Sequence, residues 1–198
     1  YGVACDLDVI PMHGWRRGFY WAETGLPWQP PSPSLWRPEA TITYPGVCFF
    51  EGTNCSVGGS TFYPYEVVGA PWIDGPALAA TLDQQGWAGV RYEAISYTPE
   101  KPNDGKYKGE VCQGVWLQVT DRQRFNPVVA ACAVLRQLHR DYSDNLTFRK
   151  PHMRLLGGSE TFLETLLTAP GLRGLAATWE SECAAFDHLR APYLLYST

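Results

Sequence analysis

The sequence of 198 residues lacks several features that would each define a class of protein. No apolar run approaches the ~20 residues that cross a bilayer, since candidates such as Val128–Leu135 are short, so we expect no membrane span. Basic residues are not in excess: 16 Lys and Arg against 20 Asp and Glu leave a formal charge of −4, which argues against a nucleic-acid binder. The sequence has no C-x-x-C pair, no histidine at zinc-finger spacing and no glycine-rich nucleotide-binding motif. We therefore expect neither a metal nor a cofactor.

What the sequence does contain is material for a packed core. Hydrophobic residues make up 45% and aromatic residues 14%, while charged residues make up only 18%, so disorder is excluded. A chain of this size with its own core does not need disulfides, so we expect buried free thiols at most of the six cysteines. The sequence starts with Tyr1 rather than Met and has no signal-peptide pattern, which suggests a piece of a longer protein.

Hydrophobic periodicity and turn residues predict intermixed strands and helices. The long stretch over residues 13–46 is rich in proline and tryptophan, and we expect a loop there. The fold class predicted is α/β of the mixed α+β kind, with one mixed sheet of four to five strands and about four helices in a single domain over residues 1–198. The expected strands are a joining strand over 1–12 and runs at Val47–Glu51, Glu66–Gly69, Val90–Tyr97 and Val111–Thr120, and the expected helices are Pro76–Gln85, Pro127–Tyr142, Glu160–Thr168 and Leu172–Leu189.

The densest polar constellation lies where the apolar run Val47–Glu51 ends. Glu51 is followed by Thr53, Asn54 and Ser56, then by a glycine-rich turn and a second carboxylate, Glu66. Two carboxylates could act as a glycosidase pair, and the hydroxyl and amide groups could hold sugar oxygens or an N-acetyl group. The alternative is that these polar side chains tie neighbouring backbone turns together. Composition favours neither interpretation.

Other polar and aromatic residues carry weaker signals. The four histidines, among them His139 and His152, have no evident orienting partner, so we expect surface or packing roles. The basic run Arg149–Arg154 is typical of a solvated loop, with an acidic partner surface as the alternative. The aromatic residues between Trp15 and Trp36, Trp28 among them, could stack on sugars or form a protein interface.

Several motifs together resemble the NamZ-like exo-β-N-acetylmuramidase family of bacteria, and the resemblance covers essentially the whole chain. The segments that carry it are Asp8–Met12, Thr24–Trp28, Pro31–Pro33, Tyr44–Gly46, Cys48–Asn54, Gly69–Trp72, Cys112–Val115, Phe125–Val128 and Tyr193–Tyr196.

The resemblance implies a protein about twice this length, in which a Rossmann-like N-terminal half packs against an α/β C-terminal half across a cleft. This chain would be the second half, with the first half or other protein subunits as its partner. The implied activity is removal of N-acetylmuramic acid from non-reducing ends of peptidoglycan fragments, with a muramyl saccharide as ligand. We expect Glu51 and Glu66 as candidate catalytic residues, and we expect the candidate substrate-binding residues to be Thr53, Asn54, Ser56, Trp28 and Trp72.

The sequence also departs from the family pattern. Val57 stands where the family usually has Glu, Gly59 and Tyr63 stand where it has Arg, and Ser34 replaces Asn. Arginine is suited to binding the lactyl carboxylate of muramic acid, so these changes predict a degenerate domain. The alternatives are a non-catalytic structural subunit of a larger assembly and a carbohydrate-binding module.

Overall fold

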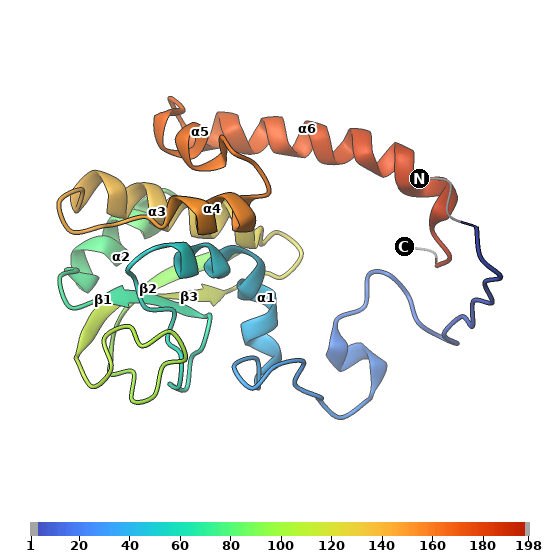
Figure 1. The fold of residues 1–198 in the computed structure, drawn as a ribbon, viewed down its shortest axis with the longest axis horizontal. Coiled ribbons are helices and arrows are strands. Elements are labelled where there is room, and N and C mark those ends of the chain that lie inside the picture. Colours follow the sequence, from blue (N-terminus) through green and yellow to red (C-terminus); the bar gives the residue numbers. More distant parts are fainter. Residues whose placement is uncertain (1–3, 197–198) are drawn as a thin grey trace. The chain divides into compact units, whose positions relative to one another are not determined.

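The computed structural model describes residues 4–196. The chain divides into two compact units. We call Gln29–Thr178 the larger unit, and Tyr1–Trp28 together with Trp179–Thr198 the smaller unit. The larger unit holds the sheet, most of the helices and the cavities described below (Figure 1).

An antiparallel sheet of three strands lies at the centre of the larger unit. Its order is β1 (Val67–Ala70), β3 (Cys112–Val119) and β2 (Val90–Tyr97). Gly114 faces Gly69 across the pair of β1 and β3, and a Cβ added to Gly114 would lie 2.0 Å from the Val68 carbonyl oxygen, so only glycine fits there. With three strands, the sheet is smaller than the four to five strands expected. Its strand pairs are all antiparallel, whereas a mixed sheet was expected.

Two expected strands are wrong. Val47–Glu51 forms the end of α1 (Pro38–Val47) and a 3-10 helix, Cys48–Gly52, because a short apolar run does not distinguish a strand from a buried helical segment. Residues 4–12 belong to no strand, and Leu7 and Ile10 are 74% and 92% exposed. An alternating pattern forms a strand only where a neighbouring strand pairs with it.

The structure has six α-helices over the described residues, against about four expected. Asp74 caps α2 (Gly75–Gln84) and Asn126 caps α3 (Pro127–Asp141), by accepting hydrogen bonds from the Ala77 and Val129 backbone amides respectively. Two helices are absent from the sequence prediction. α1 forms inside the proline-rich loop because Pro38 occupies its first turn, where the missing amide is not needed. α4 (Lys150–Gly157) replaces the expected basic loop. Besides α1, the helices are α2 (Gly75–Gln84), α3 (Pro127–Asp141), α4 (Lys150–Gly157), α5 (Phe162–Thr168) and α6 (Leu172–Arg190).

The helices pack against the sheet and against one another in the larger unit. α2 packs on β2 and β3, α1 packs on α3, and α4 contacts the 3-10 helix. In Figure 1, α3 and α4 lie along one side of the sheet. Fully buried core side chains come from both the sheet and the helices, among them Phe50, Val67, Leu82, Val115 and Leu135. No helix among the described residues is both long and apolar enough to cross a membrane.

The smaller unit is held mainly by aromatic contacts. Trp15 meets Tyr196 edge to face at 4.8 Å between ring centroids, and Trp21 meets Trp28 in the same way at 5.4 Å. The Met12 amide donates to the Tyr196 hydroxyl at 2.7 Å. Two segments that are far apart in sequence are thereby joined within this unit.

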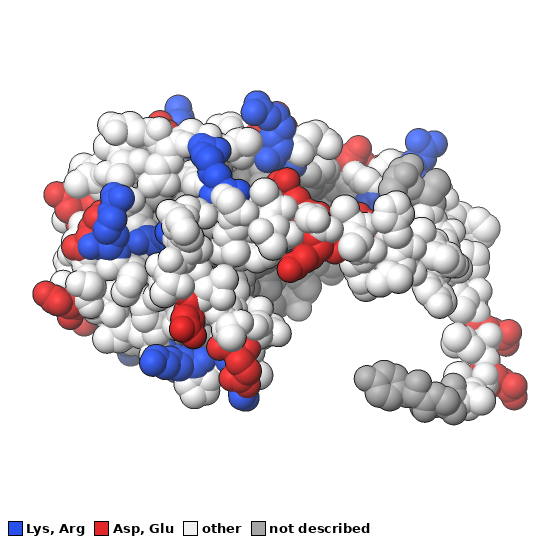
Figure 2. Space-filling model, turned by 90° about the horizontal axis from the view of Figure 1, so that it is seen from above, with Lys and Arg blue, Asp and Glu red and all other residues white. Residues whose placement is uncertain are grey.

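All six cysteines are free thiols. Cys55, Cys112 and Cys132 are buried as expected, and burial raises the pKa of Cys132 to about 12. Cys5 and Cys183 are exposed instead. On the face drawn in Figure 2, basic and acidic side chains are interspersed and separated by wide areas without formal charge.

Candidate functional site

Glu51 is positioned by the 3-10 helix that follows α1. Its neighbours Phe50 and Gly52 are buried, and a Cβ at Gly52 would lie 2.3 Å from the sulfur of Met153 in α4. This close packing fixes the turn, while the Glu51 side chain points outward and stays 31% exposed. A carboxylate in this setting is held firmly and can still reach solvent or a ligand.

The Tyr65 hydroxyl donates to Glu51 Oε1 at 2.5 Å. Burial, together with the hydrogen bond to Glu51 and its charge, raises the pKa of Tyr65, so the phenol keeps its proton and remains a donor. The backbone of Tyr65 has a φ of +58°, a left-handed conformation that is strained for a bulky residue. An edge-to-face contact with the Tyr44 ring, 4.8 Å between ring centroids, helps to hold Tyr65 in this conformation.

Two basic residues reach the same place from the start of α4. The Arg149 amide donates to the Gly52 carbonyl at 2.8 Å, which joins α4 to the 3-10 helix that carries Glu51. One turn later, His152 Nε2 lies 3.9 Å from Glu51 Oε2, a salt-bridge distance when the imidazole is protonated. Segments about 100 residues apart in sequence therefore meet around one carboxylate.

These side chains line an open cavity of about 280 Å³, which we call the Glu51 cavity. Its wall carries two acids, Glu51 and Asp104, and two bases, Arg149 and His152. Lys106 lies beside the wall: its Nζ is 3.1 Å from Asp104 Oδ2 and donates to the Phe50 carbonyl at 3.1 Å. The remaining lining residues are Ser34, Val57, Gly59, Tyr65 and Asn103. Such a cavity can take a small polar molecule that carries a carboxylate or several hydroxyls.

Glu66 does not join Glu51 in this cavity. It is 4% exposed at the start of β1, and its Oε1 lies 3.5 Å from Arg37 Nε. Burial raises the pKa of Glu66, and the charge of Arg37 partly opposes that rise. The Arg37 guanidinium also lies over the Phe62 ring at 4.4 Å. Glu66 lines a separate hollow with Arg37 and Trp116, so a facing pair of Glu51 and Glu66 is not formed.

The expected substrate-binding residues of the Glu51 segment bond to the protein itself. The Thr53 hydroxyl donates to the Phe50 carbonyl at 2.9 Å, and Ser56 Oγ accepts from the Gly58 amide at 3.2 Å. Asn54 makes a double link, because its Nδ2 donates to the Asn145 carbonyl at 2.8 Å and its Oδ1 accepts from the Thr147 amide at 2.9 Å. The second interpretation of these side chains, that they tie backbone segments together, matches this geometry.

Neither expected tryptophan lines the Glu51 cavity. Trp28 packs on Trp21 in the smaller unit. Trp72 donates from Nε1 to the Tyr107 hydroxyl at 3.0 Å and lies 5.5 Å from the Tyr142 ring. Within residues 4–196, no group of three or more His, Cys, Asp or Glu side chains is arranged to hold a metal ion.

The sequence prediction missed five residues of this cavity, namely Tyr65, Asn103, Asp104, Arg149 and His152. Arg149 and His152 lie on either side of Pro151, and a proline at this position suits a helix start, so the sequence could have indicated the helix but not its contact with Glu51. Tyr65 and Asp104 lie in turn-rich segments, where spacing alone indicates no partner.

Comparison with known proteins places the chain in a family. The family described as "Exo-beta-N-acetylmuramidase NamZ, C-terminal" matches residues 42–196, and the corresponding N-terminal family matches residues 1–39. The chain belongs to the NamZ family. The NamZ resemblance drawn from the motifs is thereby confirmed, and the boundary between the two matches lies in the first turn of α1.

A curated relative supports the same membership. The peptidoglycan β-N-acetylmuramidase NamZ of Bacillus subtilis (strain 168) is 32% identical over 197 residues, which are 99% of this chain and 47% of that protein. The chain therefore spans about half the length of this NamZ relative.

Two solved structures share the NamZ-like fold. Both are DUF1343 family proteins from Bacteroides fragilis. The first has a TM-score of 0.83 at 23% identity and covers 93% of this chain and 49% of its own. The second has a TM-score of 0.60 at 26% identity and covers 85% of this chain and 44% of its own.

Proposed function

We propose that this chain supplies part of a glycoside hydrolase active site that acts on N-acetylmuramic acid in peptidoglycan, with Glu51 as its carboxylate. The observation that carries the proposal is the setting of Glu51, a partly exposed carboxylate that accepts a 2.5 Å hydrogen bond from Tyr65 at the wall of a polar cavity. The Bacillus subtilis relative is a peptidoglycan β-N-acetylmuramidase, and this activity supplies the substrate class.

The cavity offers distinct roles for its carboxylate and its histidine. Glycoside hydrolysis needs one charged carboxylate, which stabilises or attacks the sugar carbon or activates water, and one proton donor. The Tyr65 hydroxyl holds Glu51 Oε1 in place at the wall of the cavity, so Glu51 suits the first role. Histidine is well suited to moving protons near neutral pH, so His152, 3.9 Å from Glu51, is the proton carrier that we assign within this chain.

Arg149 is the residue that we assign to substrate charge. Muramic acid differs from other amino sugars by a lactyl carboxylate, and a guanidinium binds a carboxylate through two parallel hydrogen bonds. Arg149 lines the cavity beside His152. Its backbone is tied to Gly52, so the side chain starts from a fixed point near Glu51.

The exposed surface of the smaller unit supports binding to a protein partner. It presents many large apolar side chains to solvent, and exposed patches of this kind mark interaction surfaces. We propose that the N-terminal part of the NamZ fold covers them, since this chain spans only about half the length of its relatives. The side chains are Leu7, Val9, Ile10, Met12, Phe186, Leu189, Tyr193 and Leu195, all of them more than half exposed.

The deciding experiment measures release of N-acetylmuramic acid from the non-reducing end of a muramyl disaccharide by the protein isolated with any partner that co-purifies. We expect release by the wild type and a loss of about 100-fold or more in Glu51→Gln. Glu160→Gln, a change at a 75% exposed carboxylate of another segment, serves as the matched control and should keep full activity. An unchanged rate in Glu51→Gln would contradict the proposal.

A second candidate is a non-catalytic subunit or saccharide-binding domain with the same fold. It is favoured by one observation: Ser34, Val57 and Gly59, three positions that depart from the family pattern, line the Glu51 cavity itself. Calorimetric titration with the muramyl disaccharide separates the outcomes. Binding without release supports a saccharide-binding domain, whereas flat titrations together with a fixed stoichiometry in native mass spectrometry support a structural subunit.

A further inference from the structure

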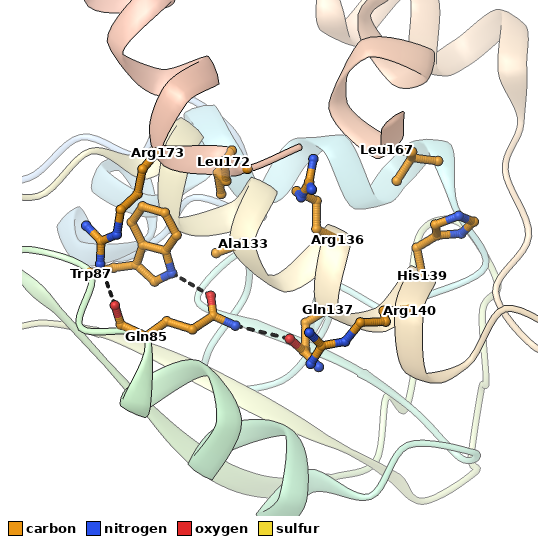
Figure 3. Close-up of a pocket in the computed structure, with 11 residues that line it drawn as sticks. Gln85, Trp87, Ala133, Arg136, Gln137, His139, Arg140, Leu167, Leu172 and Arg173 are labelled. Atoms are coloured by element: carbon orange, nitrogen blue, oxygen red, sulfur yellow. Dashed lines mark hydrogen bonds between the residues drawn. The ribbon is translucent and has the colours of Figure 1, made fainter. Parts of the chain in front are cut away.

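A second cavity of about 660 Å³, independent of the Glu51 cavity, lies between α3 and the segment that joins α5 to α6 (Figure 3). We call it the arginine cavity. Three guanidiniums line it, those of Arg136, Arg140 and Arg173, and His139 adds an imidazole. No Asp or Glu belongs to its lining. This is an unusual concentration of positive charge in a chain whose formal charge is −4.

Two of the arginines are held in place by the fold. Arg136 donates to the Leu166 carbonyl and, at 2.7 Å, to the Ala169 carbonyl, both at the C-terminal end of α5. Arg173 donates to the Gln85 carbonyl at 2.5 Å, and its guanidinium lies 4.6 Å from the centre of the Trp87 ring. These bonds leave further N–H donors of each guanidinium for a ligand, since a guanidinium carries five.

The floor of the arginine cavity is also ordered. The Trp87 indole donates to Gln85 Oε1 at 2.8 Å, and Gln85 Nε2 donates to the Oε1 of the buried Gln137 at 3.0 Å (Figure 3). Gln137 in turn donates to Asp141, which also accepts from Arg140 Nε at 3.2 Å. The Asp141 carboxylate is thereby engaged at one edge of Arg140, whose side chain remains 68% exposed.

We propose that the arginine cavity binds a small organic anion with two or more carboxylate or phosphate groups. Planar guanidiniums match such oxyanions through paired hydrogen bonds. The volume falls within the range of small-molecule sites and exceeds what a single inorganic ion fills. The Trp87 ring provides an apolar wall for the body of the ligand. The site shares no lining residue with the Glu51 cavity and stands whether or not the proposed hydrolysis holds.

Isothermal titration calorimetry on the whole chain tests the site, with citrate as the carboxylate probe, pyrophosphate as the phosphate probe and glycerol as the uncharged one. We expect binding of at least one anion, weaker at higher salt, and no heat from glycerol. Arg140→Gln and Arg173→Gln should each raise the Kd for the bound anion about tenfold. Arg140 is mostly exposed and its side chain bonds to Asp141, so its removal leaves folding intact.

Arg154→Gln is the matched control, because Arg154 is also half-exposed and paired with one acid, Glu160, but lies outside the cavity. It should leave the Kd unchanged. The proposal is overturned if neither anion binds, or if Arg154→Gln weakens binding as much as the two cavity variants, since binding would then depend on overall charge. The preferred anion between citrate and pyrophosphate identifies the ligand chemistry.

Discussion

Glu51 and Glu66 lie fifteen residues apart and were expected to form one pair, yet the structure places them in opposite situations. Glu51 is partly exposed at a polar cavity and accepts from a tyrosine hydroxyl. Glu66 is buried, and its nearest opposite charge is a guanidinium that lies on aromatic rings. The contrast shows that a carboxylate in a motif can serve chemistry or structure, and that burial and partner, rather than residue type, decide between them.

The largest expected change in stability tests the ion pair of the buried Glu66 with Arg37. Arg37→Ala leaves Glu66 buried without its opposite charge and removes the stacking on Phe62, so the free energy of unfolding should fall by about 3 kcal/mol or more. Urea denaturation measures it. Arg91→Ala, which breaks the exposed pair with Glu93, should cost at most about 1 kcal/mol. Equal losses in the two variants would show that burial does not distinguish the pairs.

A smaller loss is expected at the link that holds the basic wall of the Glu51 cavity. Asn54→Ala removes two hydrogen bonds to the segment that precedes Arg149, so the free energy of unfolding should fall by about 2 kcal/mol. The Thr147 amide should also exchange faster with solvent hydrogen. Asn145→Ala is the matched control, because it keeps the carbonyl that Asn54 uses and should be nearly neutral. Protection of Thr147 that survives in Asn54→Ala would mean that the link is not needed.

The hydrogen bond from the Tyr65 hydroxyl to Glu51 can be tested by removing the hydroxyl. Tyr65→Phe removes one hydrogen bond and keeps the ring against Tyr44, so the free energy of unfolding should fall by about 1 kcal/mol in thermal or urea unfolding. Tyr63→Phe, which removes a hydroxyl from another tyrosine of the same segment and keeps its ring against Trp116, is its control. If both changes cost the same, the short bond to Glu51 contributes nothing to stability.

The fold could be predicted from sequence wherever local signals and tertiary packing agreed. The cap at Asn126 and the helical spacing after it fixed α3 to within one residue, and the alternation of Val90–Tyr97 gave β2 its bounds. Prediction failed at Val47–Glu51 and in the proline-rich stretch, where packing on α3 and α4 selects helical turns that the local pattern leaves open.

Of the candidate site, Glu51 could be predicted because it is a charged residue that interrupts an apolar run. The positions of Arg149 and His152 beside Glu51 could not be predicted, because they depend on contacts between segments about 100 residues apart. These contacts are the two hydrogen bonds of Asn54 to residues 145–147 and the isolated β-bridge between Thr53 and Phe148. Such pairings are set by the whole fold, and no spacing in the sequence encodes them.

The smallest expected effect concerns pH and tests the Glu66 side alone. Burial raises the pKa of Glu66 in the folded protein above its value in the unfolded chain. As pH rises through the interval between those two values, the unfolded chain loses its proton first, so the free energy of unfolding should fall across this interval. Glu66→Gln cannot titrate and should flatten that slope in urea unfolding measured from about pH 4 to pH 7. Glu160→Gln, at an exposed carboxylate, should leave it unchanged. A slope of the opposite sign that disappears in Glu66→Gln would mean that the attraction of Arg37 outweighs burial in setting the pKa of Glu66.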